Sequence, residues 1–303
     1  MARQGQYASG VAYVFLATIG WSLSGLFVRL LPELDNWQIN CWRGLSMAIA
    51  LLIYLLVIHG RQTLERFDDI PFPAFLASAL CFAVGTTFYV SSLKFASTAT
   101  VSVIGATSPL ITALLSPWIT GERPHAVAWM SALLALCGMG VIANHSFVVG
   151  NMFGVLLSLG VPFTFALQTL LLRRYRNYDM MTSICMGGLL AFVLAIFGSH
   201  ALGTGTVLNV NAHTIAVLGI MGVVQLAVPL VLYGWGARTV PAVSLALISM
   251  LDAVFNPLWS LIFVGERPET TSIIGGGIIL GAVLLSILGL RLWSQQAIPQ
   301  PGE

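Results

Sequence analysis

Ten apolar runs, each about as long as a membrane span, constrain this chain more than any other feature of its sequence. They cover residues 8–30, 37–59, 72–93, 97–120, 126–146, 152–173, 179–199, 213–236, 241–264 and 271–293. A helix needs about 20 mostly apolar residues to cross a bilayer, where lipid offers no partner to open backbone groups. Because the runs lack the alternation of barrel strands, we predict an all-α integral membrane protein with ten transmembrane helices.

The composition agrees with a chain whose solvent is lipid. Of the 303 residues, 57% are hydrophobic and 8% are charged, and the formal net charge is +2. Soluble domains carry about 25% charged residues, disordered chains are polar, and nucleic-acid-binding proteins show a clustered basic stripe. We therefore expect a lipid bilayer and a small molecule as partners, and no nucleic acid. Four cysteines lie in apolar runs without metal-ligand spacing, so we predict no metal and no cofactor.

The basic residues favour one orientation in the membrane. Ten spans put both termini on one side, and the first run is too long for a cleaved signal peptide. With cytoplasmic termini, nine basic residues lie inside (Arg3, Arg61, Arg66, Arg123, Arg173, Arg174, Arg176, Arg238 and Arg291) and three lie outside (Arg29, Lys94 and Arg267). This distribution follows the positive-inside rule, so we predict that both termini are cytoplasmic.

An offset of 144 residues aligns the two halves of the chain without a gap. It matches a helix-ending motif, built on Gly121, Glu122 and Pro124, to an identical motif built on Gly265, Glu266 and Pro268. It also pairs Gly10 with Gly154, Arg29 with Arg173, Asp35 with Asp179, Cys41 with Cys185, Gly44 with Gly188, Tyr89 with Tyr233 and Lys94 with Arg238. We infer an internal duplication.

The duplicated unit has five spans, so the second copy enters the membrane upside down. We predict two inverted five-helix repeats, at residues 8–146 and 152–293, followed by a polar tail at 294–303. Inverted repeats are typical of secondary transporters, whose substrate site lies near the midplane between the halves. A duplicated scaffold without transport is the alternative.

These motifs resemble the EamA-type members of the drug/metabolite transporter superfamily. The resemblance rests on the repeated Gly-Glu-Arg-Pro, on Thr107-Ser108-Pro109-Leu110 before its first copy, and on Trp21-Ser22. It implies a ten-helix carrier of the bacterial inner membrane, often an exporter of amino acids or related metabolites. Within the superfamily the chain is most similar to aromatic amino-acid exporters of the YddG type. The second half departs from the pattern, since Asp252-Ala253 replaces Ser108-Pro109.

The ninth span carries an acidic residue near the bilayer centre. Asp252 lies eleven residues after Pro241 and thirteen before Gly265, and burying it there costs about 2.5–3.5 kcal/mol. It either lines the pathway, where it binds a substrate amino group or carries a proton, or holds neighbouring helices together. Ser249, Asn256 and Trp259 lie on the same helix face, and Pro257 predicts a kink in this span.

A basic residue lies inside the second span. Arg43 either snorkels outward, forms a structural pair, or holds a substrate carboxylate. Its counterpart in the second half is Gly187. The other candidate cavity residues are aromatic or polar side chains within spans: Trp21, Ser24, Tyr89, Ser108, Phe163, Gln168, Gln225 and Trp235. For each of these residues the alternative to substrate binding is a structural role, as an interfacial anchor or in an interhelical hydrogen bond.

We predict a secondary exporter of amino acids, aromatic or neutral, that works by alternating access. No Walker A motif is present, so this chain does not hydrolyse ATP. An exporter of drugs or other metabolites is the alternative within the superfamily. An intramembrane enzyme is disfavoured because all five histidines lie at span ends or in loops. Two halves in one chain are compatible with a transporter that works as a monomer.

Overall fold

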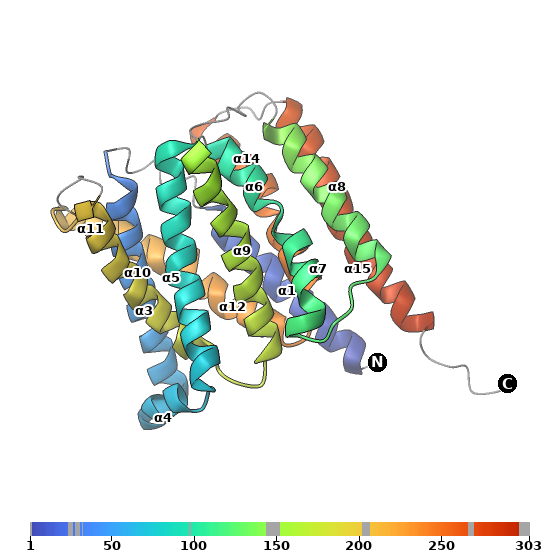
Figure 1. Ribbon diagram of the computed structural model, residues 1–303, viewed down its shortest axis with the longest axis horizontal. Coiled ribbons are helices and arrows are strands. Elements are labelled where there is room, and N and C mark those ends of the chain that lie inside the picture. The colour runs from blue at the N-terminus through green and yellow to red at the C-terminus, as the bar shows by residue number, and fades with distance from the viewer. Residues whose placement is uncertain are drawn as a thin grey trace.

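Helix is the main structure of every predicted span in the computed structural model (Figure 1). The structure describes residues 2–23, 27, 31, 33–96, 98–143, 152–201, 207–265 and 270–296, and no strand occurs among them. Its helices are α1 (Ala2–Ser22), α3 (Asn36–His59), α4 (Thr63–Asp68), α5 (Phe72–Phe95), α6 (Thr98–Gly105), α7 (Ser108–Ile119), α8 (Ala126–Ala143), α9 (Met152–Arg174), α10 (Met181–Ala201), α11 (Ala212–Met221), α12 (Val228–Ala237), α13 (Ala242–Ser249), α14 (Asp252–Val264) and α15 (Thr270–Gln296). A 3-10 turn, η1 (Gly60–Gln62), precedes α4, and a π-helical segment, η2 (Gly222–Ala227), joins α11 to α12.

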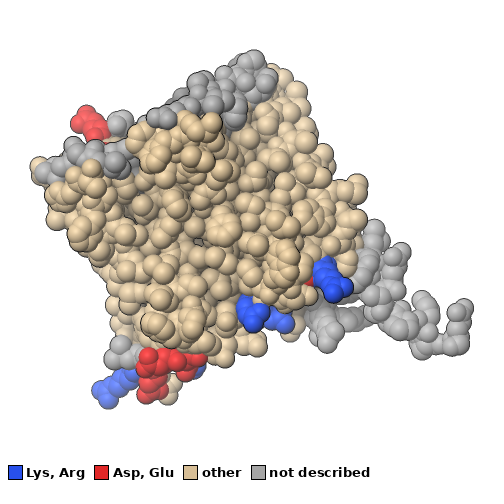
Figure 2. Space-filling view, in the orientation of Figure 1, with Lys and Arg blue, Asp and Glu red and all other residues tan. Residues whose placement is uncertain are grey.

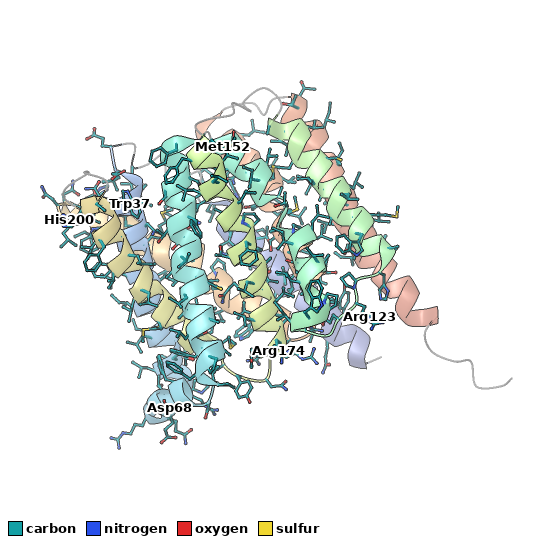
Figure 3. The ribbon with its side chains drawn as sticks, in the orientation of Figure 1. Trp37, Asp68, Arg123, Met152, Arg174 and His200 are labelled. Atoms are coloured by element: carbon teal, nitrogen blue, oxygen red, sulfur yellow. The ribbon has the colours of Figure 1, made fainter. Side chains whose placement is uncertain are left out.

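Nine helical segments in the described part of the chain are long and apolar enough to cross a membrane. They match the second to tenth predicted spans, so the multi-pass architecture is confirmed at this level. The predicted first span, 8–30, is described only in part, and α1 is not among the nine. Most of the charged side chains visible in Figure 2 gather at one end, below a broad band without charge. Figure 3 shows Asp68, Arg123 and Arg174 at this end and Trp37, Met152 and His200 at the other.

The long helices pack in layers across the molecule. α8 and α15 lie along each other at one side, and α3, α10 and α5 form the other side (Figure 1). Between them α9 packs on α5 and α7, and α1 packs on α12, α13 and α14. The four cysteines are all free.

Small residues allow a close helix contact between α3 and α10. A Cβ atom on Gly188 would lie 2.8 Å from the carbonyl oxygen of Gly44, and a Cβ atom on Gly44 would lie 3.2 Å from that of Gly188. Membrane helices use such small residues because close backbone packing replaces the hydrophobic effect that lipid cannot supply. The two glycines are counterparts at the offset of 144.

Two of the spans carry a break in the α-helical hydrogen bonding, which the sequence analysis did not foresee. The backbone stays right-handed at both breaks, and the hydrogen bonds tighten there to i→i+3 turns. The fourth span breaks between α6 and α7, at residues 106–107, and the ninth breaks between α13 and α14, at residues 250–251. The half-helices start at Thr98 and Ala242 and again at Ser108 and Asp252, each pair 144 residues apart. α14 continues through Pro257, and the break lies two turns before that proline.

The turns after these spans explain the two glycines of the repeated motif. Gly121 has φ +75° and Gly265 has φ +78°, a left-handed conformation that side chains with a Cβ atom rarely adopt. Gly265 thereby ends α14 in the usual way for a glycine cap.

A bulky residue at the α3–α10 contact should destabilise the protein. Gly188→Val would bring a Cβ atom within 2.5 Å of the Met47 methyl carbon, and overpacking of this kind lowers the unfolding free energy by roughly 1–3 kcal/mol. Gly140→Val is the matched control, because nothing lies within 4 Å of a Cβ atom at Gly140 in α8. The melting temperature of the purified protein should fall for Gly188→Val alone. Equal melting temperatures of the two variants would contradict this packing.

Candidate substrate site and gate

The break in the ninth span puts an acidic residue at a helix start inside the membrane. Asp252 is the first residue of α14, and its half-buried carboxylate lies where the positive end of the helix dipole favours an anion. Ser249 ends α13 on the other side of the break, buried, with its hydroxyl donating to the Leu245 carbonyl oxygen at 2.8 Å. Interrupted helices at this depth supply substrate and ion sites in secondary transporters.

Tyr89 links two charged candidates from different helices electrostatically. The Tyr89 hydroxyl of α5 lies within electrostatic reach of the Arg43 guanidinium of α3 and of the Asp252 carboxylate. Arg43 lies two turns after the start of α3, and Tyr89 lies about two turns before the end of α5. The sequence singled out all three residues, but their proximity is visible only in the fold.

Arg43 does not snorkel to the surface. Only 8% of the residue is exposed, and its Nε atom has no hydrogen-bond partner among the residues that the structure describes. Its Nη2 atom donates to the Asn40 Oδ1 atom at 3.4 Å, and the Asn40 Nδ2 atom has no partner either. Leaving a buried donor unsatisfied costs about 1–3 kcal/mol, and an intramembrane charge is by default a candidate functional group.

An aromatic cluster lies on the other side of the break. The Trp21 ring centroid is 5.0 Å from that of Tyr233 and 6.2 Å from that of Phe165. The Tyr233 hydroxyl lies 3.0 Å from the Thr169 hydroxyl, and only 2% of Tyr233 is exposed. Its counterpart Tyr89 is 38% exposed. The same tyrosine is therefore packed in one half and open in the other.

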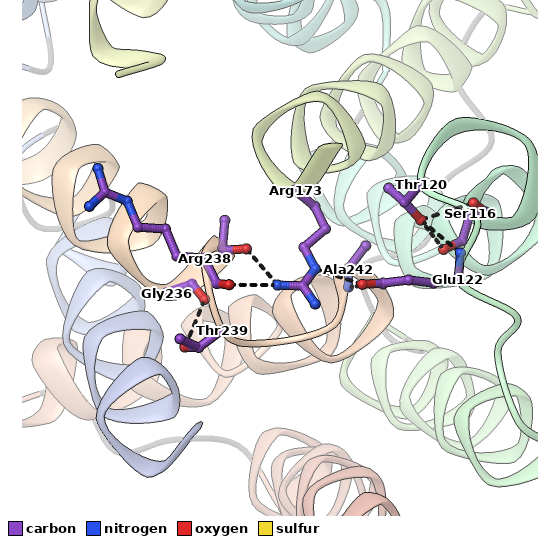
Figure 4. Close-up of polar contacts among 9 residues, drawn as sticks. Ser116, Thr120, Glu122, Arg173, Gly236, Arg238, Thr239 and Ala242 are labelled. Carbon is purple, nitrogen blue, oxygen red and sulfur yellow. Dashed lines mark hydrogen bonds and ion pairs between the residues drawn. The ribbon is translucent and has the colours of Figure 1, made fainter. Parts of the chain in front are cut away.

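Glu122, from the first copy of the repeated motif, links four segments at the charged end of the molecule (Figure 4). Its Oε1 atom accepts from the Arg173 Nε atom at 2.6 Å, and its Oε2 atom accepts from the Ala242 backbone N–H at 3.2 Å. Arg173 also donates through Nη1 to the carbonyl oxygens of Ala237, at 3.0 Å, and Arg238, at 2.9 Å. We call this network the Glu122 lock. In this network the Glu122 carboxylate accepts from a backbone N–H at the start of α13, and the Arg173 guanidinium donates to backbone carbonyl oxygens at the end of α12. Each charge has the sign that the helix dipole favours at that end.

Within the described residues, the two halves pack on each other more extensively beside the lock than at the opposite end. α13 packs on α7, α8 and α9 beside the lock. The equivalent pair at the other end is α6 and α14, where α6 packs on α5, α8 and α9, and α14 on α1 and α15. Within the described residues, α6 and α14 do not pack closely on each other.

The remaining candidates divide into those near the break and those away from it. Trp259 donates from Nε1 to the Ser22 hydroxyl at 2.7 Å, so α14 is tied to the end of α1. Asn256 is half-buried on α14, and Ser108 is buried at the start of α7. Phe163 is largely exposed. Trp235 lies toward the charged end, with its ring centroid 5.4 Å from that of Tyr13.

Two buried glutamines differ in their surroundings. Gln168 donates from Nε2 to the Ser78 hydroxyl at 3.0 Å, in a cluster with Ser183 that joins α9, α5 and α10. Gln225 lies in η2, and its Oε1 atom has no partner. Pro229 lacks the N–H that an α-helix would donate to the Gln225 carbonyl, and the π-helical segment lies directly before it. Ser24, Glu266 and Pro268 lie outside the described residues.

The sequence analysis missed three residues of this arrangement. Asn40 precedes Arg43 by one turn on the same face, a spacing that could have identified it. Phe165 is the counterpart of Trp21, which the offset of 144 could have indicated. Arg173 was counted only as a topological charge, and no local pattern predicts its pairing with Glu122.

Comparison with known proteins identifies the class. The model of the EamA-like transporter family matches the chain twice, at residues 8–144 and 152–288. The chain therefore belongs to the EamA-like transporter family, and the predicted membership is confirmed. The two matches are themselves 144 residues apart, which fits the two-repeat architecture.

Individual relatives agree with a transporter rather than an enzyme. The chain is 25% identical over 254 residues to the uncharacterized transporter YdfC of Bacillus subtilis (strain 168), covering 82% of this chain and 80% of the relative. It is 24% identical over 285 residues to the pseudopaline exporter CntI of Pseudomonas aeruginosa (strain UCBPP-PA14), covering 91% and 95%. A solved crystal structure has the same fold, with a TM-score of 0.80 and 18% identity, covering 94% of this chain and 99% of that one.

Removing the carboxylate of the Glu122 lock should destabilise the protein more than removing an exposed ion pair. Glu122→Ala leaves Arg173, whose side chain is 10% exposed, without its carboxylate, and we expect a loss of about 2–4 kcal/mol in unfolding free energy. Asp69→Ala is the control, because the Arg66–Asp69 pair is nearly half exposed and should contribute less than about 1 kcal/mol. Chemical or thermal unfolding of the purified protein measures both. Similar losses in the two variants would contradict the structural role of the lock.

Proposed function

We propose that this protein is a secondary transporter that exports amino acids across the bacterial inner membrane by alternating access. The observation that carries the proposal is the pair of interrupted spans, with Asp252 at the start of the second half-helix. Interrupted spans at equivalent positions of two halves form the substrate site of secondary transporters near the bilayer midplane. The family match and the exporter among the relatives support transport in the outward direction.

Two inverted five-helix repeats, at 8–146 and 152–293, with a polar tail at 294–303, are part of this proposal. The interrupted helices begin at positions 144 residues apart, and α8 and α15 do so as well. A two-fold axis would bring counterparts into contact where it passes between them. Gly44 with Gly188, and Trp21 with Phe165, are two such contacts.

The charges favour a cytoplasmic position for the end that carries the Glu122 lock. α1 begins and α15 ends there (Figure 1), and the segments at this end carry Arg61, Arg66, Arg123, Arg173, Arg174, Arg176 and Arg238. The positive-inside rule places such an end in the cytoplasm. In that orientation the protein is closed to the cytoplasm and open to the exterior, which is the state that releases an exported substrate.

The duplication suggests what closes the opposite side in the other state. Glu266 is the counterpart of Glu122, and Arg29 is the counterpart of Arg173. Both lie outside the described residues, so an outer Glu266–Arg29 pair is expected from the sequence alone. Tyr89 would then take the packed position that its counterpart Tyr233 holds here. One lock would form as the other opens, as alternating access requires.

An amino acid fits the chemistry around the break. Asp252 can accept hydrogen bonds from an ammonium group, and the rings of Trp21, Phe165 and Tyr233 offer the apolar surface that small-molecule sites use. This supports an aromatic or neutral substrate. Export of another small metabolite is the second candidate, since one relative is a pseudopaline exporter.

Flux measurements test the substrate and the role of Asp252. Purified protein in liposomes should take up radiolabelled phenylalanine with saturable kinetics, at equal pH on both sides, with threonine and glutamate as comparison solutes. Asp252→Asn removes the charge that holds the ammonium group and should lower phenylalanine flux about tenfold or more. Asp69→Asn, at an exposed position, is the control and should leave flux unchanged.

The other outcomes have distinct meanings. Flux that requires a pH gradient and disappears in Asp252→Asn would make Asp252 a proton carrier instead. Absence of flux for all three amino acids would contradict the proposed substrate and favour the second candidate.

Weakening the Glu122 lock should open the cytoplasmic side. Glu122→Gln removes the charge from the Arg173 contact and should shift the population toward the cytoplasm-open state about tenfold or more. A cysteine at Ser249, in a chain lacking the four native cysteines, would report this as faster reaction with a charged thiol reagent added from the cytoplasmic side. Asp69→Asn should not change that rate. Unchanged labelling in Glu122→Gln would contradict the gating role.

A further inference from the structure

Two donor atoms on one turn of α3, Arg43 Nε and Asn40 Nδ2, have no acceptor among the described residues, although both side chains are buried. Arg43 is 8% exposed and Asn40 is 1% exposed. The Arg43 Nε and Asn40 Nδ2 atoms are both without a partner, and Arg43 forms no ion pair with any side chain that the structure describes. Because Arg43 has only donors, the Asn40 oxygen must face it, which leaves the amide NH₂ as the free group.

This combination calls for an anionic acceptor. A guanidinium group and an amide NH₂ on one helix face, at spacing i and i+3, match the two oxygens of a carboxylate. Tyr89 of α5 lies within electrostatic reach of the same guanidinium. Tyr89 is 38% exposed, so this corner adjoins the open side of the molecule.

The second half cannot duplicate this corner. The counterparts of Asn40 and Arg43 are Ile184 and Gly187. A Cβ atom on Gly187 would already lie 2.9 Å from the Ala79 carbonyl oxygen and 2.9 Å from the Phe82 Cβ atom, so no long side chain fits there. Each chain therefore has one such set of donors, on α3, and binds one acceptor there.

We propose that Asn40 and Arg43 form the carboxylate subsite of the transported substrate, whose amino group the proposed function assigns to Asp252. This deepens the proposed function and rests on it. Both donor atoms are covered in the present conformation, so the carboxylate reaches them when the flexible Arg43 side chain turns toward Tyr89. The substrate class is a small molecule with a carboxylate and a separate cationic amine, such as an α-amino acid.

The test compares ligands that carry or lack each charged group. Binding to the full-length protein in nanodiscs is measured for phenylalanine, phenylalaninamide, 3-phenylpropionate and phenethylamine, with thermal stabilisation as the readout. Wild type should bind phenylalanine about tenfold or more tightly than phenylalaninamide. In Arg43→Gln this ratio should fall to about one, because binding of the amide is unchanged. Arg61→Gln, which removes an exposed arginine, should keep the wild-type ratio.

A second variant guards against a folding defect in Arg43→Gln. Asn40→Asp places a carboxylate beside Arg43 in the protein itself, so it should occupy the guanidinium, keep the melting temperature and abolish discrimination for the carboxylate. A wild-type ratio near one, or a tenfold ratio that survives in both folded variants, would overturn the subsite.

The subsite and the proposed function can fail separately. Saturable phenylalanine flux with no preference over the amide would retain the exporter and reject the subsite. Stabilisation by 3-phenylpropionate that depends on Arg43, with no flux of any amino acid, would retain the subsite and reject the amino-acid assignment. If no carboxylate stabilises the protein in an Arg43-dependent way, the subsite is rejected.

Discussion

The ion pair between Glu122 and Arg173 is the interaction on which this arrangement of the two halves depends. It joins the turn after α7 to the end of α9, and it satisfies backbone groups at the end of α12 and the start of α13. Without it, backbone N–H and C=O groups at three helix ends would lie close together without these partners. Glu122 remains 30% exposed, so water can take over its hydrogen bonds when the pair separates. A contact that is strong in geometry yet open to water is suited to a gate that must open in each cycle.

The two halves share their helix positions but differ in key side chains, and this difference accounts for both the proposed gate and the proposed substrate site. The half-helices repeat at an offset of 144, but Asp252 stands where the first half has Ser108, and Arg43 stands where the second half has Gly187. Charges this deep in a membrane protein are costly, and neither forms an ion pair with a described side chain. In the proposed mechanism the repeated backbone supplies two equivalent closures, and the side chains that differ between the halves form the substrate site.

The sequence predicts those parts of the structure that follow from local patterns. Hydropathy located the spans, and the repeated motif marked the helix ends, where its glycines have positive φ. The break at residues 250–251 has no local signal, because its residues are Met and Leu within a continuous apolar run. At the first break Pro109 gives one, since proline is favoured in the first turn of a helix. The contacts of Arg43 with Asn40 and of Glu122 with Arg173 depend on how helices pack, which hydropathy does not encode.

Distances at the two ends of the molecule test the central claim, that the halves alternate between two closures. Spin labels at Arg123 and Arg238 would report the cytoplasmic end, and labels at Ser102 on α6 and Ile262 on α14 would report the opposite end; all four residues are exposed. Pulsed electron paramagnetic resonance in nanodiscs, with and without phenylalanine, would measure both distance distributions. The account predicts opposite changes, with one distance lengthening as the other shortens. Distances that stay fixed, or that change in the same direction, would contradict it.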